Sequence, residues 1–315
     1  MNKIFFCLII FSLCLSGVNA HAETLYVGEK EKYKTFIDVE SQIKDGDVLE
    51  IAPGIYRECL IFEASNVVIR PKGWPKQEGK VRFQDVTCED KGIFVLSGDD
   101  ITVQGIEFVN ARVPDYNGAG IRFEGANLLV EDSYFINNEM GVLTGKNLNS
   151  KVIVKRSVFE DNGLASISSD VAIGHGLYVG EVASLYVFNS RFVNQKIGHH
   201  IKSRAIYNEI VGNKISDGEN GTASYSIDIS NGGSVLIEGN NIQKGPLSDN
   251  LGTAICIACE GGLNESKNIF VRNNEFINDT GREVVFLTNL TSTKERLENN
   301  MFKGAKVLDV FHYYP

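Results

Sequence analysis

The stretch that decides the fold runs from Gly174 to Ala205, GHGLYVGEVASLYVFNSRFVNQKIGHHIKSRA. It holds two short segments of alternating character, Leu177–Val179 and Ile201–Ser203, and each is entered through a Gly-His pair. Between them lies Leu185–Val193, whose pattern recurs along most of the chain. A period of two residues is typical of β-strands, so this window predicts short strands within a repeating unit.

The recurring pattern is a pair of apolar residues five positions apart. The copies are Val103/Phe108, Val130/Phe135, Val154/Phe159, Val187/Phe192, Ile210/Ile215, Ile237/Ile242, Val271/Phe276 and Leu297/Phe302. Three residues after the first member of each pair stand Ile106, Ser133, Ser157, Ser190, Asn213, Asn240, Asn274 and Asn300. The copies are 23 to 34 residues apart, and another short strand segment lies between most of them. We therefore expect a solenoid with two short strands and a turn in each coil.

Stacking of such coils explains the repeat physically. Equivalent apolar residues of successive coils form continuous columns, which bury a core that no single coil could bury. Asn side chains stacked at an inward turn satisfy one another's amides, as in the amide ladders of cross-β structures. The absence of helices between the strands excludes a doubly wound α/β fold, and the Leu-rich phrase of leucine-rich repeats is missing. The chain is predicted to be all-β.

A short helix is expected before the first coil. Thr35 can cap it, apolar residues at helical spacing follow, and Gly46 can end it. The Gly46–Glu58 segment then alternates like a strand and turns at a Pro-Gly pair. This arrangement resembles the first coil of right-handed parallel β-helix proteins, in which a short helix covers the open end of the core. The fold class implied is a right-handed parallel β-helix solenoid with a short N-terminal capping helix.

The N-terminus predicts export. Lys3 precedes the apolar run Ile4–Leu15, which is too short to span a bilayer, and Ala20-His21-Ala22 fits a cleavage site. We predict a signal peptide at 1–22, although cleavage before His21 also fits, and a periplasmic or secreted location. Residues 23–315 are then one β-helix domain, with the cap and first coil in 23–60. No later apolar run is long enough to span a membrane.

The net charge and the cysteine content restrict the possible classes of protein. The formal net charge is −9, so the basic footprint of a nucleic-acid-binding protein is absent. Four cysteines follow the predicted signal peptide, and an even number in an exported chain permits disulfides. We predict a disulfide between Cys59 and Cys88, which are separated by about one coil. Cys256 and Cys259 could be half of a zinc site or a redox pair, but without further spaced ligands a structural role is favoured.

Strand parity predicts a column of outward side chains across the coils. With the flanking apolar residues inward, the column is Phe94, Arg122, Leu143, Tyr178, Lys202, Asp228 and Cys256, and nearby outward positions add Glu124, His200, Arg204, Ser226 and Ser230. His175 and His199 align at the starts of their strands, where the preceding glycines permit a turn that exposes them. So many basic side chains on two coils of an acidic chain predict a positive groove for an anionic ligand. Lys202 is expected to be exposed and to contribute little to the core.

Two families share parts of this window. Gly174–Gly180 and Ile201-Lys202 resemble the Gly-His-Gly and Arg-Ile-Lys blocks of polygalacturonase-type hydrolases, with His200 where their Arg would stand. Lys202-Ser203 resembles the Lys-Ser phrase of alginate- and chondroitin-type polysaccharide lyases of the same fold, the pectin lyase-like superfamily. The paired acids that hydrolysis of a glycosidic bond requires are absent upstream. β-Elimination or epimerisation at a uronate therefore fits better than hydrolysis.

The resemblance implies roles for the side chains, with an acidic polysaccharide as partner. Lys202 would be the base, and Arg204 and His200 would neutralise the uronate carboxylate. Tyr178 or His175 would protonate the leaving oxygen. The other predicted ligand-binding residues are His199, Asp228 and Arg122, and the groove walls are expected near 160–173 and 244–253. No cofactor or metal is assigned, since no cluster of acids suggests a calcium cage. The alternative is a non-catalytic β-helix that binds a polymer or assists assembly of an exported complex.

Overall fold

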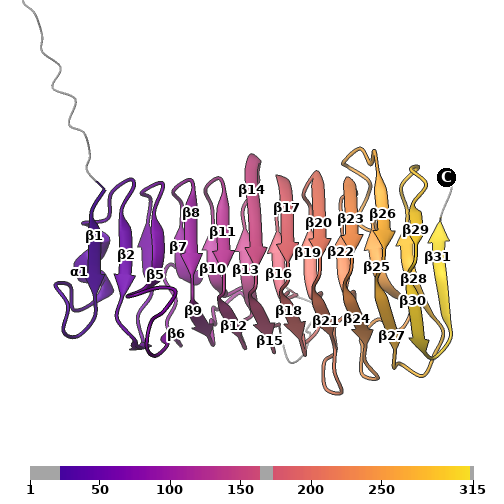
Figure 1. Ribbon diagram of the computed structural model, residues 1–315, viewed down its shortest axis with the longest axis horizontal. Coiled ribbons are helices and arrows are strands. Elements are labelled where there is room, and N and C mark those ends of the chain that lie inside the picture. Colours follow the sequence, from indigo (N-terminus) through magenta and orange to yellow (C-terminus); the bar gives the residue numbers. More distant parts are fainter. Residues whose placement is uncertain (1–21, 164–172, 313–315) are drawn as a thin grey trace, which may run out of the picture.

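The computed structural model describes residues 22–163 and 173–312. The predicted signal peptide, residues 1–22, lies outside these residues except for Ala22. The described chain winds into a parallel β-helix whose coils stack along one long axis (Figure 1). After the first strand, which joins one sheet only, each coil contributes one strand to each of three parallel sheets, so the predicted all-β solenoid is confirmed.

The three sheets are named here in the order in which the chain visits them. The first sheet contains β1 (Thr24–Val27), β2 (Val48–Ile51), β5 (Val68–Pro71), β8 (Ile101–Gln104), β11 (Leu128–Glu131), β14 (Asn147–Lys155), β17 (Val182–Phe188), β20 (Tyr207–Val211), β23 (Ser234–Glu238), β26 (Ile269–Arg272) and β29 (Arg296–Glu298). The second contains β3 (Gly54–Tyr56), β6 (Val81–Gln84), β9 (Ile106–Val109), β12 (Tyr134–Ile136), β15 (Val158–Glu160), β18 (Arg191–Val193), β21 (Lys214–Ser216), β24 (Asn241–Lys244), β27 (Glu275–Asn278) and β30 (Met301–Gly304). The third contains β4 (Leu60–Phe62), β7 (Gly92–Leu96), β10 (Ala119–Phe123), β13 (Met140–Thr144), β16 (Leu177–Val179), β19 (Ile201–Ser203), β22 (Ile227–Ile229), β25 (Thr253–Ile257), β28 (Val284–Asn289) and β31 (Val307–His312).

The expectation of two strands in each coil is wrong, because the five-residue pattern contains two strands rather than one. In the pair Val130/Phe135, Val130 belongs to β11 and Phe135 to β12. Between them Asp132 has a φ of 51°, a left-handed conformation that Gly, Asn and Asp adopt most readily. One such residue bends the chain from the first sheet into the second. A bend this short leaves no visible break in the apolar pattern.

The columns predicted from the repeat form the core. The Phe135 ring stacks on Phe108 at 5.1 Å and on Phe159 at 4.7 Å, and Phe159 stacks on Phe192 at 4.6 Å. All four rings are buried. Offset or parallel stacking at these distances adds to the hydrophobic free energy of burial. The core is therefore continuous along the axis.

The small polar residues between the apolar pairs form the predicted internal ladder. The side chain of Asn240 accepts hydrogen bonds from the backbone N–H and the side-chain amide of Asn213, at 2.9 and 3.0 Å. Its own amide donates to the Ile210 carbonyl at 2.9 Å and to Asn274 Oδ1 at 3.0 Å. Only 2% of Asn240 is exposed, so its amide relies on these partners.

Replacing Asn240 by leucine is expected to lower the free energy of unfolding by about 2–3 kcal/mol. The substitution leaves buried groups of two neighbouring coils without partners, and each such group costs roughly 1–3 kcal/mol. Denaturant unfolding followed by circular dichroism measures the change. Asn149→Leu, at an exposed position of β14, is the control. Equal stability of the two variants would contradict an internal ladder.

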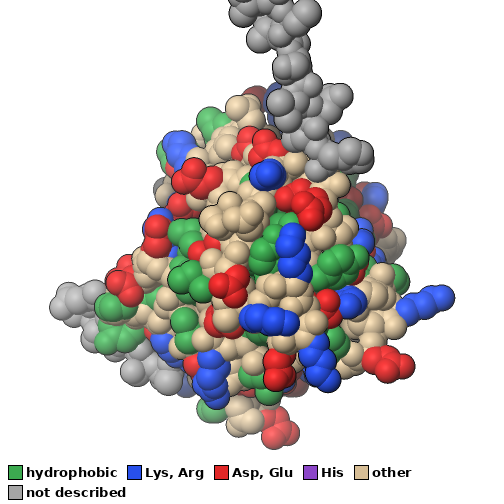
Figure 2. Space-filling model, turned by 90° about the vertical axis from the view of Figure 1, so that its left-hand side faces the viewer, with side chains coloured by type: hydrophobic (Ala, Val, Ile, Leu, Met, Phe, Trp, Pro, Cys, Tyr) green, Lys and Arg blue, Asp and Glu red, His purple; other side chains and the backbone are tan. Residues whose placement is uncertain are grey.

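The N-terminal end of the core is covered by α1 (Phe36–Glu40). The helix is shorter than the predicted Thr35–Gly46 segment, because 3₁₀-type bonds from Gln42 to Val39 and from Ile43 to Glu40 tighten its last turn and end it. Phe36 packs against Phe83 with ring centroids 4.7 Å apart. Figure 2 looks onto this end of the molecule, where charged side chains are interspersed with hydrophobic ones. The cap thus separates the core from solvent.

Both cysteine pairs lie in disulfides. Cys59 and Cys88, the pair predicted from coil spacing, are joined with their Cα atoms 5.6 Å apart. Cys256 and Cys259 are joined with their Cα atoms 6.0 Å apart, and they close a short loop after β25. Within residues 22–163 and 173–312, no helix is both long and apolar enough to cross a membrane.

Candidate functional site

The outward side chains of the third sheet form one column. The strand register pairs Arg122 with Leu143, Leu143 with Tyr178, Tyr178 with Lys202, and Lys202 with Asp228. A pocket of about 470 Å³ lies on the column, and Arg122, Leu143, Tyr178 and Lys202 line it. Since adjacent strands are about 4.8 Å apart, these four residues extend over roughly 14 Å. The structure therefore places these four residues together, whereas Asp228 and Cys256 are buried members of the column, and one predicted residue does not belong to it.

The exception is Phe94, which was expected to belong to this column. The register pairs Arg122 with Val95 and places Phe94 opposite Ile121, on the inward face. Phe94 packs against Phe83 at 4.7 Å and Phe108 at 4.8 Å. Strand β7 is buried along its whole length, so parity alone could not identify its outward residue.

Lys202 is at the centre of an ion-pair network. Its amino group donates to Glu260 and lies 3.6 Å from Asp228 Oδ2. It also lies 5.5 Å from the centre of the Tyr178 ring, a cation–π distance. Only 6% of Lys202 is exposed. The expectation of an exposed lysine is thus wrong, because Glu260, Asp228 and the Tyr178 ring surround its amino group.

Arg204 shares Glu260 with Lys202. One terminal nitrogen of its guanidinium donates to Glu260, the other donates to Asn231 at 2.7 Å, and Nε donates to the Tyr178 hydroxyl oxygen at 3.0 Å. One carboxylate therefore spans two cations from the same strand end. Partial burial raises the pKa of Glu260, but the hydrogen bond from Lys202 and the charges of Lys202 and Arg204 outweigh it and lower that pKa below its ordinary value.

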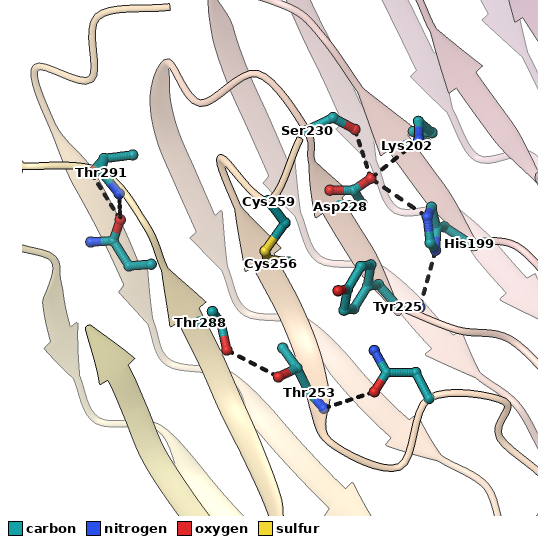
Figure 3. The surroundings of a disulfide bond; sticks show 12 residues. His199, Lys202, Tyr225, Asp228, Ser230, Thr253, Cys256, Cys259, Thr288 and Thr291 are labelled. Atoms are coloured by element: carbon teal, nitrogen blue, oxygen red, sulfur yellow. Dashed lines mark hydrogen bonds and ion pairs between the residues drawn. A yellow bond between two sulfur atoms is a disulfide. The ribbon is translucent and has the colours of Figure 1, made fainter. Parts of the chain in front are cut away.

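Asp228 lies beneath this network and is 1% exposed. Its Oδ2 atom accepts a hydrogen bond from Ser230 at 2.6 Å and faces Lys202 and His199 (Figure 3). Its Oδ1 atom has no hydrogen-bond partner among the described residues. Burial raises the pKa of Asp228, since a desolvated carboxylate is less stable than the neutral acid. Asp228 is thus easier to protonate than an exposed aspartate.

His175, His199 and Tyr225 form a stack along one edge of the pocket. Ring centroids are 4.9 Å apart for His175 and His199, and 5.0 Å apart for His199 and Tyr225. Each histidine Nδ1 accepts a backbone N–H of the next coil, from His199 at 3.0 Å and from Tyr225 at 3.1 Å. These bonds assign the proton of each neutral ring to Nε2.

Both histidines are neutral at physiological pH. Burial, with the nearby charge of Lys202, lowers the pKa of His199 to about 3 and that of His175 well below its ordinary value. His199 Nε2 lies 3.5 Å from Asp228, a contact that favours the charged ring, but burial outweighs it. The two histidines therefore offer neutral N–H donors to the site, and they do not add positive charge as expected.

His200 does not belong to the surface site. Its Nε2 atom is 2.8 Å from Asp217 Oδ1, and both side chains are 1% exposed or less. The prediction that His200 faces outward is wrong, because the strand begins only at Ile201 and the preceding turn directs the imidazole to the buried carboxylate. His200 cannot contact a polymer from this position.

The predicted positive groove is neutralised by its own acids. Arg122 pairs with Glu124 at 3.2 Å, and Glu260 with Asp228 balances the two cations of the central network. Of the expected walls, 160–173 lies mostly outside the described residues. The other, 244–253, is partly buried: Ser248 Oγ donates to the Ala223 carbonyl at 2.6 Å, while Leu247 is exposed. Within the described residues, no group of three or more His, Cys, Asp or Glu side chains is arranged to hold a metal ion.

Glu260 is the residue of this network that sequence reasoning missed. It lies beyond the end of β25, two coils after Lys202, and reaches back over the coil that carries Asp228. Strand parity makes no statement about loop residues. The available signal was the sequence Cys256-x-x-Cys259-Glu260-Gly-Gly, which predicts a tight loop with an acid at its turn.

Comparison with known proteins identifies the fold. A family model described as right handed beta helix region matches residues 76–215. The fold is therefore a right-handed parallel β-helix. This β-helix has 13% sequence identity to the pectate lyase Pel9A, with a TM-score of 0.53, over 91% of this chain and 77% of that one.

Two further solved structures are similar to this β-helix. A pectin methylesterase from Aspergillus niger is 12% identical, with a TM-score of 0.47, over 89% of this chain and 85% of that one. A PL6 family alginate lyase, AlyGC, is 15% identical, with a TM-score of 0.38, over 92% of this chain and 40% of that one. A search of curated proteins found no match. Identities this low identify a fold only, so function has to be argued from the site itself.

Proposed function

We propose that this β-helix binds an acidic polysaccharide across the pocket of the third sheet and acts on a uronate by β-elimination. The observation that carries the proposal is the sharing of one carboxylate, that of Glu260, by Lys202 and Arg204. Two cations spaced to hold one carboxylate are also spaced to hold the carboxylate of a uronate. The exported location predicted from residues 1–22, and a single domain over 23–315, are part of this proposal.

Lys202 would remove the proton alpha to the uronate carboxyl. A lysine acts as a base only after losing its own proton, and Asp228 is placed to receive it, with Oδ2 3.6 Å from Nζ. Burial, by raising the pKa of Asp228, favours this transfer. Arg204 would hold the uronate carboxylate and stabilise the negative charge that develops on it as the proton leaves. Lys202 and Asp228 would thus act together as the general base: Lys202 takes the proton from the uronate, and Asp228 holds the proton that Lys202 has released.

Tyr178 would protonate the leaving glycosidic oxygen. Arg204 Nε already donates to its hydroxyl oxygen at 3.0 Å, so the phenolate left after proton transfer has a charged hydrogen-bond partner. The bond between the sugar ring carbon and the leaving oxygen breaks as the unsaturated uronate forms, and no further reactant is needed. Return of a proton to the opposite face of the uronate, without loss of the oxygen, would give epimerisation instead.

The charge balance of the pocket favours a second candidate, a β-helix that binds a polymer without turnover or assists assembly of an exported complex. Each cation of the central network and Arg122 already has a carboxylate partner in the chain. A site of this kind needs no proton transfer. Its polymer affinity would arise from exchange of ion pairs and would fall with added salt.

Incubation with alginate, pectate and glycosaminoglycans, followed by ultraviolet absorbance of unsaturated uronates, tests the proposal. We expect the absorbance to rise with one class of polymer and the rise to disappear in Arg204→Gln, which removes the carboxylate-holding cation. Arg191→Gln, on the second sheet, is the matched control and should retain full activity. Polymer binding without any absorbance change or epimerised product would favour the second candidate. If the protein neither binds nor cleaves any of these polymers, both candidate functions are contradicted.

A further inference from the structure

The central network contains a ligand for its own cations. Glu260 has 39% of its side chain exposed, whereas Lys202 has 8% and Arg204 24%. The carboxylate therefore lies on the solvent side of the two cations and covers them. Lys202 and Glu260 both line the pocket, so a uronate that enters it would compete with Glu260 for the lysine.

The loop that carries Glu260 is closed by a disulfide before this residue and continues into two glycines after it. The Cys256–Cys259 disulfide closes the loop directly before Glu260 (Figure 3), and the backbone N–H of Glu260 donates to the Ser230 carbonyl at 3.1 Å. Gly261 follows with a φ of 101° and with open space where a side chain would stand. Such a φ is readily available only to glycine, and the next residue is also glycine. Because the Gly261 N–H donates to the Ala258 carbonyl at 3.1 Å, displacement of the carboxylate would come from rotation of the partly exposed Glu260 side chain.

The cations would not lose all their partners if Glu260 moved. Lys202 would keep Asp228, while Arg204 would keep Asn231 and the Tyr178 hydroxyl. Arg204 would then have no carboxylate partner, and Lys202 would retain only Asp228, at 3.6 Å. This is the arrangement that binds a carboxylate.

We propose that Glu260 is a resident carboxylate that occupies the anion site of Lys202 and Arg204 and must be displaced before a uronate binds. The inference rests on the proposed function and adds a specificity element to it. An incoming anion has to compete with a tethered one, so weakly held monoanions are rejected and ligands that also contact the rest of the pocket are favoured. Apparent affinity is reduced in proportion to the fraction of molecules in which the site is free.

The test compares glucuronate binding to wild type and to Glu260→Gln by nuclear magnetic resonance titration, with glucose as the uncharged control ligand. We expect Glu260→Gln to bind glucuronate about tenfold more tightly, since glutamine keeps the size of the side chain but cannot pair with the cations. Glu238→Gln removes a carboxylate from another ion pair, with Arg272 at 3.0 Å, and should leave the affinity unchanged. Arg204→Gln added to Glu260→Gln should abolish the gain.

A second variant tests the tether. Cys259→Ala opens the loop while Cys256 stays buried in β25, and a gain in glucuronate affinity smaller than that of Glu260→Gln is expected. Unchanged or weaker affinity in Glu260→Gln overturns the inference. Loss of turnover in Glu260→Gln with unchanged binding also overturns it, because Glu260 would then be a catalytic acid, while the proposed function would stand. If Glu260→Gln binds glucuronate more tightly but the protein neither binds nor cleaves any polymer, the inference about Glu260 is supported and the proposed function is contradicted.

Discussion

Lys202→Ala is expected to abolish turnover and to destabilise the fold at the same time. A positioned general base contributes about 10²–10⁴-fold to a rate, so the loss of activity should be of this size or larger. The free energy of unfolding should fall by about 3 kcal/mol, because alanine leaves the 1%-exposed Asp228 without its cationic partner. The activity assay described above and denaturant unfolding measure the two effects.

Lys202→Arg separates the two roles that this lysine could have. Arginine keeps the charge beside Asp228 but does not release its proton at working pH. A catalytic base therefore predicts that Lys202→Arg recovers much of the stability and none of the turnover, whereas a purely binding role predicts that it recovers polymer binding too. Lys214→Ala, exposed on the second sheet, is the control and should change neither quantity. Turnover that survives in both Lys202 variants would exclude this residue as the base.

The periodic part of the fold could be read from the sequence because each coil repeats the same physical requirement. Each coil needs an apolar residue in the Phe column and a small polar residue in the Asn ladder. The same residue types therefore recur at the same positions of successive coils, and the repeat can be recognised even though each copy alone is a weak pattern. The division of each coil into three strands could not be read, since a single left-handed residue such as Asp132 makes the bend. Only the backbone conformation reveals that bend, and several residue types satisfy it.

The candidate site was predictable to the extent that it follows strand parity. Tyr178, Lys202 and Asp228 were placed on one column by the two-residue period and by coil spacing, and the register of β16, β19 and β22 agrees. Burial of Lys202 was not predictable, because Glu260 covers it from a loop two coils away. The geometry of this loop depends on local turns and on the Cys256–Cys259 disulfide. These features do not repeat from coil to coil, so a periodic sequence pattern cannot predict them.

His200 shows how parity fails at the end of a strand. It was predicted to face the ligand, but it forms a buried pair with Asp217, whose Oδ2 atom also accepts the backbone N–H of Gly245 at 2.9 Å. Burial lowers the pKa of the adjacent Lys244 to about 8, against the opposing charge of Asp217. The sequence contains no signal that distinguishes a histidine in such a cluster from one at a surface.

His200→Ala and Asp217→Ala are each expected to lower the free energy of unfolding by about 3 kcal/mol, the cost of leaving one partner of a buried pair alone. The double variant should lose little more than either single one, because two residues that act through one contact are not additive. Denaturant unfolding of the four proteins gives this coupling directly. Glu265→Ala removes an exposed partner of Lys267 and should have no measurable effect. A residue that binds substrate at the surface affects binding and not folding. If His200→Ala leaves the stability unchanged but raises the KM for the polymer, His200 belongs to the surface site and the buried-pair interpretation is contradicted.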